Sequence, residues 1–574
     1  MANPGMFKNI RVYWIAFVVY WGIILFGYDT GVAGAVVGSS FFQQSFGLLD
    51  ESGKLNKKKS DEISSNVVSV LQAGAFFGAL GSAPISGELA PAPTPARTPP
   101  SILIAPLAKI GRRSTLMLFS AIFLIGAVPP SADRFPLLQI LTVVANGGSK
   151  GLSEIYAGRV IIGLGIGGIS AVSPAYVSEC SPKEVRGRIT GLFQIFVATG
   201  VALSYWVNYG IQVTQQPGPV YWRIPFGLQL VPAGIMCLGL FTLKESPRWL
   251  ASVGRAEEAL HNLAYLRREP PTSDAVLHEF AEIEAAIQEE QEARAGLGWK
   301  EAFFGKGNFI RFVIAFTIFM LQQWGGQNAI NYYSPQIFAQ LGYVNRKSSL
   351  LATGVYGLVK LGATSLFIFF GVDWLGRKPS FIISAYGMGV CWFIIGALLK
   401  THPVPPGTAN APSTPPASSQ AMAAVIYIFV IFYSMGWGPL PWVYCADIFP
   451  TRTRHYGLAV ASASQWLFNF MLTKLTLQIQ TALGYKFFFM FGTINILGLG
   501  TFSLLIPETK GRSLEDMDVI FGAVSAEKRA KDIERQQKAL DEGGPAAAAV
   551  PVHASGDDRD RESASDARAS QEKV

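Results

Sequence analysis

Twelve apolar stretches, each long enough to cross a lipid bilayer, constrain this chain more than any other feature. A helix needs ~20 apolar residues to span the hydrocarbon core. The stretches lie at about 13–37, 64–85, 114–130, 152–177, 190–211, 224–243, 309–333, 349–370, 380–399, 421–445, 457–478 and 485–506. Only 15% of the 574 residues are charged, whereas a soluble domain carries about 25%. We therefore expect an all-α membrane protein with twelve transmembrane helices, surrounded by the lipid bilayer.

One long polar connection divides the apolar stretches into six and six. We predict an N-terminal six-helix half at 1–243, a cytoplasmic helical linker at 244–308, a C-terminal six-helix half at 309–520 and a disordered cytoplasmic tail at 521–574. Basic turns follow corresponding spans of the two halves, as Gly111-Arg112-Arg113 and Gly376-Arg377-Lys378. This repetition favours a transporter built from two related halves, although unrelated charge clusters that happen to align are the alternative.

The basic residues give the chain a formal net charge of +8 and gather after even-numbered spans. This pattern is typical of cytoplasmic loops, so we expect a multi-pass plasma-membrane protein with both termini in the cytoplasm, and no binding to nucleic acid. Four scattered cysteines and five histidines do not form a metal-binding motif. No nucleophile–base arrangement or cofactor motif is present either, so we expect no cofactor, no metal and no enzymatic activity.

Amide and aromatic side chains inside the spans suggest a site for hydroxylated molecules, because an amide both donates and accepts hydrogen bonds. The candidates for substrate binding are Gln194, Gln322, Gln323, Asn328, Gln465 and Asn469, with Trp442 and Trp466 as flat surfaces for a ring. Buried amides can also serve only to hold helices together. Lys360 lies near the middle of the eighth span; it could contact a substrate carboxylate, pair with an internal acid or extend toward the membrane surface.

The ordered motifs along the chain resemble those of the sugar porter family of the major facilitator superfamily. They include Phe26-Gly-Tyr-Asp29-Thr-Gly31, Glu245-Ser-Pro-Arg-Trp-Leu250, Gln322-Gln323-Trp-Gly-Gly-Gln-Asn328 with Tyr332-Tyr333, Gly436-Trp-Gly-Pro439 and Pro507-Glu-Thr-Lys-Gly511. Within that family the sequence is similar to the fungal quinate-permease-like and sugar-acid branch, whose members tend to share a lysine at the Lys360 position. The resemblance implies a major facilitator fold of two six-helix halves.

The resemblance also implies roles for charged residues. Asp29 and Arg159 would form a buried pair that couples transport to protons, with a purely structural ion pair as the alternative. Tyr332 and Tyr333 resemble the outer gate of the family. Ion pairs at the cytoplasmic side would involve Arg112, Arg113, Glu179, Arg186, Glu245, Arg377, Asp447, Arg452, Arg454 and Glu508, unless these residues only set the topology.

Together these features predict a proton symporter that imports a polyhydroxylated small molecule such as quinate, a sugar acid or a hexose, working as a monomer by alternating access. A neutral monosaccharide facilitator is the main alternative, and a transporter-like nutrient sensor is a further one. Residues 87–107 and about 129–140 interrupt the family pattern. We interpret at least the first as a retained intron or gene-model error, with a genuine loop variant as the alternative.

Overall fold

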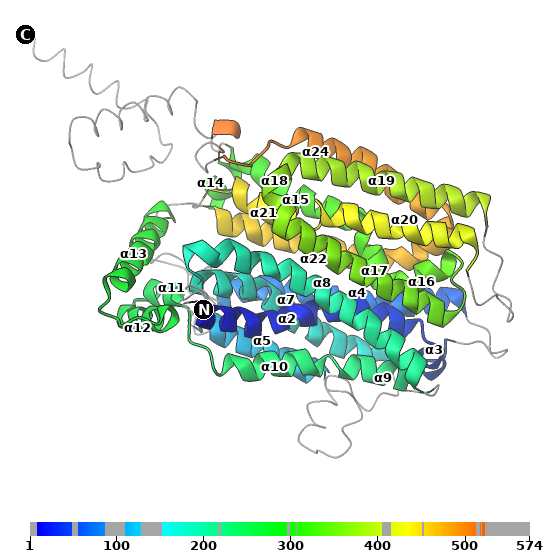
Figure 1. Cartoon of the computed structure of the whole chain (residues 1–574), viewed down its shortest axis with the longest axis horizontal. Coiled ribbons are helices and arrows are strands. Elements are labelled where there is room, and N and C mark those ends of the chain that lie inside the picture. The colour runs from blue at the N-terminus through cyan, green and yellow to red at the C-terminus, as the bar shows by residue number, and fades with distance from the viewer. Residues whose placement is uncertain are drawn as a thin grey trace, which may run out of the picture.

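The computed structural model describes residues 9–48, 56–85, 110–127, 152–215, 218, 220–294, 299–305, 307–403, 415–450, 453–512, 517 and 519–522. Within these residues the secondary structure is helical (Figure 1). The helices before the linker, called the N-half here, are α2 (Ile10–Val37), α3 (Ser40–Ser45), α4 (Lys57–Ile85), α5 (Arg112–Ala127), α7 (Leu152–Cys180), α8 (Lys183–Thr214), α9 (Val220–Gly227) and α10 (Leu230–Leu240).

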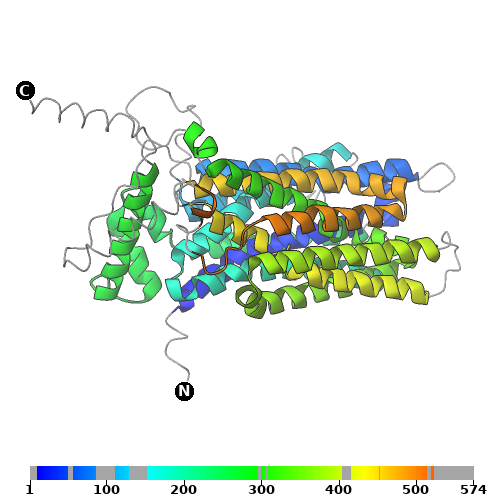
Figure 2. The same ribbon diagram turned by 90° about the horizontal axis from the view of Figure 1, so that it is seen from above.

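Four helices connect the N-half to the remaining bundle. They are α11 (Pro247–Ser252), α12 (Ala256–Arg267), α13 (Asp274–Arg294) and α14 (Trp299–Phe304). In two perpendicular views α11, α12 and α13 lie beyond one end of the bundle, which we call the linker end (Figures 1 and 2). The guanidinium carbon of Arg11, at the start of α2, lies 3.9 Å from the ring centroid of Tyr265 in α12. The first span therefore begins at the linker end.

The helices that follow the linker are called the C-half here. They are α15 (Asn308–Trp324), α16 (Gln327–Gln340), α17 (Arg346–Leu366), η2 (Phe367–Gly371), α18 (Val372–Leu375), α19 (Arg377–Thr401), α20 (Ala417–Ser434), α21 (Leu440–Ile448), α22 (Arg454–Leu483), α23 (Lys486–Thr493), η3 (Ile494–Gly500) and α24 (Thr501–Leu505). The predicted boundaries of the halves, linker and tail stay predictions.

Ten of the predicted spans are long and apolar enough to cross a membrane within the described residues. The two others differ for separate reasons. The described part of α5 has 16 residues, and the chain beyond it, which includes the predicted insertion at 129–140, lies outside the described residues. Helix α22 has 30 residues but carries polar side chains such as Gln465, Asn469 and Lys474. Together these helices make up the predicted twelve-helix, all-α fold.

Close approach between α4 and α7 depends on small residues. A Cβ atom added at Gly163 or Gly167 of α7 would overlap the backbone carbonyl of Leu71 or Ala75 of α4. Such contacts let helix backbones approach closely in a membrane, where lipid tails leave no hydrophobic drive for helix association. The glycine-rich run in α7 is therefore explained by helix packing.

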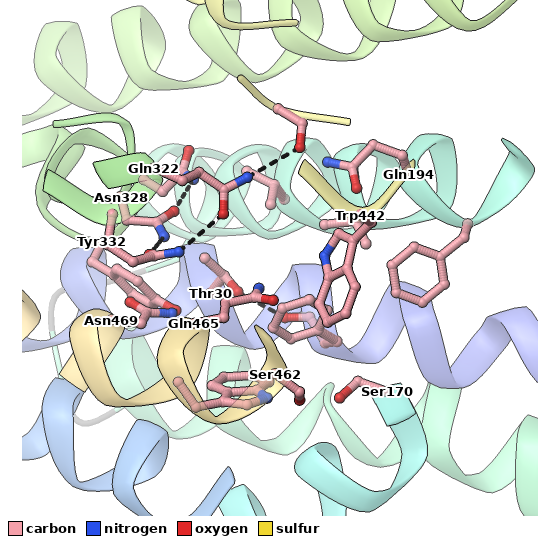
Figure 3. A pocket seen from close by; sticks show the side chains of 18 of the residues that line it. Thr30, Ser170, Gln194, Gln322, Asn328, Tyr332, Trp442, Ser462, Gln465 and Asn469 are labelled. Atoms are coloured by element: carbon pink, nitrogen blue, oxygen red, sulfur yellow. Dashed lines mark hydrogen bonds between the residues drawn. The ribbon is translucent and has the colours of Figure 1, made fainter. Parts of the chain in front are cut away.

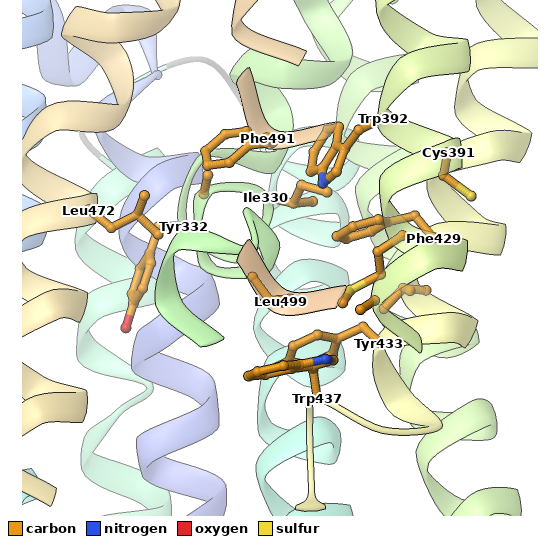
Figure 4. Close-up of a cluster of buried hydrophobic side chains, with 14 of the residues drawn as sticks. Ile330, Tyr332, Cys391, Trp392, Phe429, Tyr433, Trp437, Leu472, Phe491 and Leu499 are labelled. Carbon is orange, nitrogen blue, oxygen red and sulfur yellow. The ribbon is translucent and has the colours of Figure 1, made fainter. Parts of the chain in front are cut away.

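A break in the seventh span is held by the aromatic core of the C-half. Helix α15 ends at Trp324, and Gly326 takes a φ of +92° before α16 begins. The carbonyl oxygen of Gly325 accepts hydrogen bonds from the Trp392 indole at 3.1 Å and from the Asn495 amide at 2.9 Å. Trp392 is itself packed among aromatic side chains, with Phe491 stacked at 5.4 Å between ring centroids (Figure 4). The core thus fixes the point at which α15 and α16 change direction.

Candidate functional site

A cavity of about 100 Å³ lies between the two halves, and most of its polar lining comes from the C-half. Its wall contains Phe26, Thr30, Ser170, Ala171, Phe193, Gln194, Val197, Val201, Gln322, Gln323, Asn328, Asn331, Tyr332, Lys360, Tyr433, Gly438, Trp442, Ser462, Gln465, Trp466 and Asn469. All nine residues predicted to bind substrate are in this set. Figure 3 shows amide groups from different helices gathered around the same space. Their shared location is a finding, whereas their role in binding stays a prediction.

An ordered chain of amides follows one side of the cavity. Gln322 donates to the carbonyl oxygens of Trp437 at 2.8 Å and Gly438 at 3.2 Å, in the turn between α20 and α21. Gln323 donates to the side-chain oxygen of Gln322 at 3.2 Å, and Asn328 donates to that of Gln323. These side chains line the cavity and join the span interrupted between α15 and α16 to the span interrupted between α20 and α21. Discontinuous helices with exposed backbone polar groups are a common way for transporters to build binding sites.

Other amides of the cavity have acceptor oxygens that are buried and, within the described chain, unpaired. Among the described residues, the side-chain oxygens of Gln465 and Asn469 are buried without a hydrogen-bond partner. Leaving such groups unpaired costs about 1–3 kcal/mol each. Trp466 and Phe26 add flat apolar surfaces and contact each other edge-on, with 5.5 Å between ring centroids. This combination suits a ring that has both hydroxyl groups and an apolar face.

Lys360 brings a basic side chain to the cavity wall. The side chain is buried, and its Nζ donates a hydrogen bond to the Asn331 side-chain oxygen at 3.2 Å. Among the described residues no carboxylate forms a salt bridge with this ammonium group. Two of the alternatives predicted from the sequence therefore lack support within the described chain. No internal acid pairs with Lys360 there, and the side chain does not extend toward the membrane surface, because the residue is 3% exposed.

Asp29 and Arg159 form the ion pair that the resemblance implied. The Arg159 Nη1 lies 2.7 Å from the Asp29 Oδ1, and both side chains are almost fully buried in membrane-spanning helices. Arg159 also donates to the Val67 carbonyl at 3.1 Å, so the pair joins α2, α4 and α7. The second carboxylate oxygen of Asp29 has no hydrogen-bond partner among the described residues. The neighbouring Thr30 lines the cavity.

The two predicted gate tyrosines are neighbours in α16, where Tyr333 has non-helical backbone angles, and their hydroxyl groups meet different partners. Tyr332 lines the cavity, where its hydroxyl accepts a hydrogen bond from Asn469 at 3.3 Å. The hydroxyl of Tyr333 instead donates to the Thr473 carbonyl at 2.8 Å. The structure thus places Tyr332 at the site and Tyr333 within the packing between α16 and α22.

Contacts between the halves close the end of the bundle opposite the linker. Gln336 donates to the carbonyl of Gly34 at 2.7 Å, and Arg346 donates to that of Ala35 at 2.7 Å. Both donors belong to the C-half and both acceptors lie in the last turn of α2. Arg346 thus satisfies a carbonyl that the end of the helix leaves without a backbone partner among the described residues, and Gln336 adds a second donor to the Gly34 carbonyl, which also accepts from the Gly38 N–H.

Related junctions occur in both halves at the linker end. Arg112 pairs with Glu179 at 2.9 Å in the N-half, and Arg377 lies 3.4 Å from Asp447 in the C-half. Of the other predicted ion-pair residues, Arg113, Arg186 and Arg454 donate to backbone carbonyls, and Arg452 lies outside the described residues.

Glu245 and Glu508 bind helix N-termini. The Glu245 carboxylate accepts from the Arg113 backbone N–H at 3.0 Å, and Glu508 accepts from those of Arg377 and Lys378 at 3.0 and 2.8 Å. Burial raises the pKa of Glu245 despite its backbone donors. Partial burial also acts to raise the pKa of Glu508, but backbone N–H donors outweigh it and lower that pKa overall.

The sequence analysis missed several polar residues of the cavity, including Thr30, Asn331 and Tyr433. Asn331 had a detectable signal, since it lies one helical turn after both Gln327 and Asn328. The insertion predicted at 87–107 lies outside the described residues.

Solved structures of similar fold define the class of protein. The chain aligns with the inward-open xylose transporter XylE from E. coli at a TM-score of 0.66 and 24% identity, covering 89% of this chain and 99% of that one. A proton:xylose symporter XylE structure bound to 6-bromo-6-deoxy-D-glucose gives a TM-score of 0.66 at 26% identity, with 90% and 100% covered. The fold is that of major facilitator superfamily transporters.

The family assignment follows from the sequence matches. The model of the family described as "Sugar (and other) transporter" matches residues 15–89 and 101–521, and the chain belongs to this family. The interruption between these ranges falls inside the insertion predicted at 87–107. Similar relatives are the quinate permease of Emericella nidulans, at 34% identity over 90% of each chain, and a probable quinate permease of Neosartorya fischeri, at 33% identity over 90% of this chain and 89% of that one. These relatives are transporters, which confirms that the chain is not an enzyme.

Proposed function

We propose that this sugar-type transporter is a proton symporter that imports a polyhydroxylated carboxylate, such as quinate or a sugar acid, by alternating access. The observation that carries the proposal is a cavity between the halves that combines unpaired amide oxygens with the amino group of Lys360. Quinate permeases among the relatives support this substrate class.

Recognition of the substrate would be divided by chemistry. Hydroxyl groups would bind the free oxygens of Gln465 and Asn469, and the ring would lie against Trp442 or Trp466. The carboxylate would approach Lys360, whose charge is balanced by no acid among the described residues. A hydrogen bond to a charged group stabilises by about 1.5–3 kcal/mol, which is enough to favour an anion over its uncharged analogue.

Proton coupling would use the pair of Asp29 and Arg159. A carboxylate in a membrane-spanning helix is costly unless it is paired or protonated, and the second oxygen of Asp29 is free to take a proton. Protonation would weaken the ion pair between Asp29 and Arg159 and thereby the connection between α2 and α7. The relaxed bundle would then bind substrate, move to the inward-facing state and release both solutes.

The net charge moved depends on the substrate. A proton transported with a monoanion carries no net charge, whereas a proton transported with a neutral sugar carries one charge. The membrane potential contributes ~2.3 kcal/mol per charge and 100 mV. In the import of a sugar acid with one proton, the pH gradient would therefore contribute to the driving force and the membrane potential would not.

We also propose that the chain is a multi-pass plasma-membrane protein, works as a monomer and has both termini in the cytoplasm. Basic residues near the linker end, such as Arg113, Arg248 and Lys378, support the orientation because cytoplasmic loops are enriched in Lys and Arg. The start of α2 lies at this same end.

The test is external pH during substrate addition to transporter-deficient yeast that expresses the chain. Quinate, galacturonate and glucose are added in turn, and we expect alkalinisation with one of the acids. Asp29→Asn should abolish it. Asp274→Asn, the same change at an exposed position of α13, should leave it intact. Saturable uptake of glucose with no pH change would instead indicate a facilitator and limit Asp29 to a structural role.

A further inference from the structure

We propose that Asn331 is a positioning residue that directs the ammonium group of Lys360 into the cavity and thereby sets the preference for anionic over neutral substrates. This inference rests on the proposed contact between Lys360 and the substrate carboxylate. Asn331 is 4% exposed and lines the cavity beside Lys360.

The side-chain oxygen of Asn331 is a shared acceptor for three groups. It accepts hydrogen bonds from the Gln327 amide at 3.1 Å, the Tyr356 hydroxyl at 3.0 Å and the Lys360 ammonium at 3.2 Å. Its own amide nitrogen donates to the side-chain oxygen of Asn328 at 2.9 Å. Because three donors meet the oxygen and an acceptor meets the nitrogen, the orientation of the amide is determined by its surroundings.

The backbone of Asn331 is also fixed, through a contact between the halves. Pro335 has no N–H, so it cannot bond to the carbonyl four residues earlier, which is that of Asn331. The Tyr205 hydroxyl, from α8 of the N-half, donates to this carbonyl at 2.7 Å. The side chain of Asn331 is thus held by its neighbours in the C-half and its backbone by the N-half.

An amide is suited to this role because it directs a cation without neutralising it. An ammonium group has three donors and no acceptor, so one bond to Asn331 leaves two donors for a ligand. A carboxylate at position 331 would form an ion pair with Lys360 and compete with the substrate. A neutral amide oxygen holds the group at the cavity wall and keeps its positive charge available.

The experiment compares two ligands that share the quinate ring, quinate and its uncharged methyl ester, as inhibitors of labelled quinate uptake. Both are tested on the wild type and on Asn331→Leu, Asn331→Asp and Lys360→Met. We expect the wild type to prefer quinate, and Asn331→Leu to lower this preference about tenfold. Asn331→Asp should lower it further, since the new carboxylate neutralises Lys360. It is nearly isosteric, so it preserves the test if the leucine variant fails to fold.

The double variant with Lys360→Met separates a positioning role from direct contact. If Asn331 acts through Lys360, adding Asn331→Leu to Lys360→Met changes the ligand preference no further. A further drop in that background, or equal weakening of both ligands by Asn331→Leu alone, would overturn the inference. Asn208→Leu removes another buried amide, one outside the cavity wall, and should leave the ligand preference unchanged.

A failure of the proposed function has a different signature. If the wild type and Lys360→Met bind quinate and its ester equally well, the contact between Lys360 and the carboxylate is absent, and the inference falls with it. If Lys360→Met loses the preference for quinate over its ester but the Asn331 variants keep the wild-type preference, the proposed substrate contact stands and the inference alone is wrong.

Discussion

Arg159 in the N-half and Lys360 in the C-half are both basic, buried and placed in membrane-spanning helices, yet their partners differ. Arg159 meets a carboxylate, Asp29, at 2.7 Å, whereas Lys360 meets the neutral oxygen of Asn331 at 3.2 Å. The first charge is balanced inside the protein, and the second is balanced by no acid among the described residues. Under the proposed function, this difference would assign the proton to the N-half and the anion to the C-half.

The amides follow the same division. Of the cavity amides, Gln194 comes from the N-half, and Gln322, Gln323, Asn328, Asn331, Gln465 and Asn469 come from the C-half. The N-half otherwise contributes Thr30, Ser170 and apolar residues to the wall. Under the proposed function, substrate binding and proton coupling would be separated between the halves and would meet where Thr30, next to Asp29, lines the cavity.

Removing Arg159 should have the largest effect. Arg159→Leu leaves Asp29 buried without its partner, and breaking a buried pair in this way costs about 3–5 kcal/mol. We expect a large drop in melting temperature in detergent, measured by fluorescence. The double variant Asp29→Leu/Arg159→Leu should recover much of this loss and still show no substrate-induced pH change. Equal melting temperatures for the single variant and the wild type would contradict the pairing as a source of stability.

Removing Lys360 should affect binding and spare stability, opposite to the pattern for Arg159. Lys360→Met deletes a buried cation with no carboxylate partner in the described chain, so its removal also deletes a desolvation cost. We expect the KM for quinate to rise by about 10- to 100-fold and the melting temperature to be equal to or above that of the wild type. A clear loss of stability with unchanged KM would show that Lys360 is structural.

Sequence alone predicted the parts of the site that follow from the cost of polar groups in a membrane. Such groups must face the interior, which explains why Gln322, Gln465 and Lys360 line one cavity. Tyr332 and Tyr333 were predicted to share a role, but their hydroxyl groups have different partners, Asn469 for Tyr332 and the Thr473 carbonyl for Tyr333. Which partner a side chain meets depends on tertiary packing, here on how α16 packs against α22.

The junctions at the linker end show the same limit of prediction from the sequence. Glu245 and Glu508 were predicted as partners of arginine side chains, and they accept hydrogen bonds from backbone N–H groups at the starts of α5 and α19. The sequence shows that the acids and the basic turns are present. It does not show whether the side chain or the backbone N–H of a basic residue is the donor. Gly111 and Gly376, with φ near +85° and +87°, turn the chain at each of these helix starts.

Glu245 and Glu508 should produce the smallest effects, with opposite pH dependence. The pKa of Glu508 is lowered in the folded protein, so its stabilising contribution is present above the unfolded-state pKa and is lost as the pH falls through the folded-state pKa. The pKa of Glu245 is raised by burial, so its contribution is present below the unfolded-state pKa and is lost as the pH rises through the folded-state pKa.

Melting temperatures of both glutamine variants between about pH 4 and pH 8, a window that includes the ordinary glutamate pKa, test this contrast. Glu508→Gln should be less stable than the wild type at pH 7, by about 1 kcal/mol as for charges at helix ends, and should approach it at low pH. Glu245→Gln should match or exceed the wild type at pH 7, with the difference shrinking on acidification. Parallel curves for the two variants would mean that the junctions of the N-half and the C-half are electrostatically equivalent, and the contrast between the halves would then be confined to the cavity.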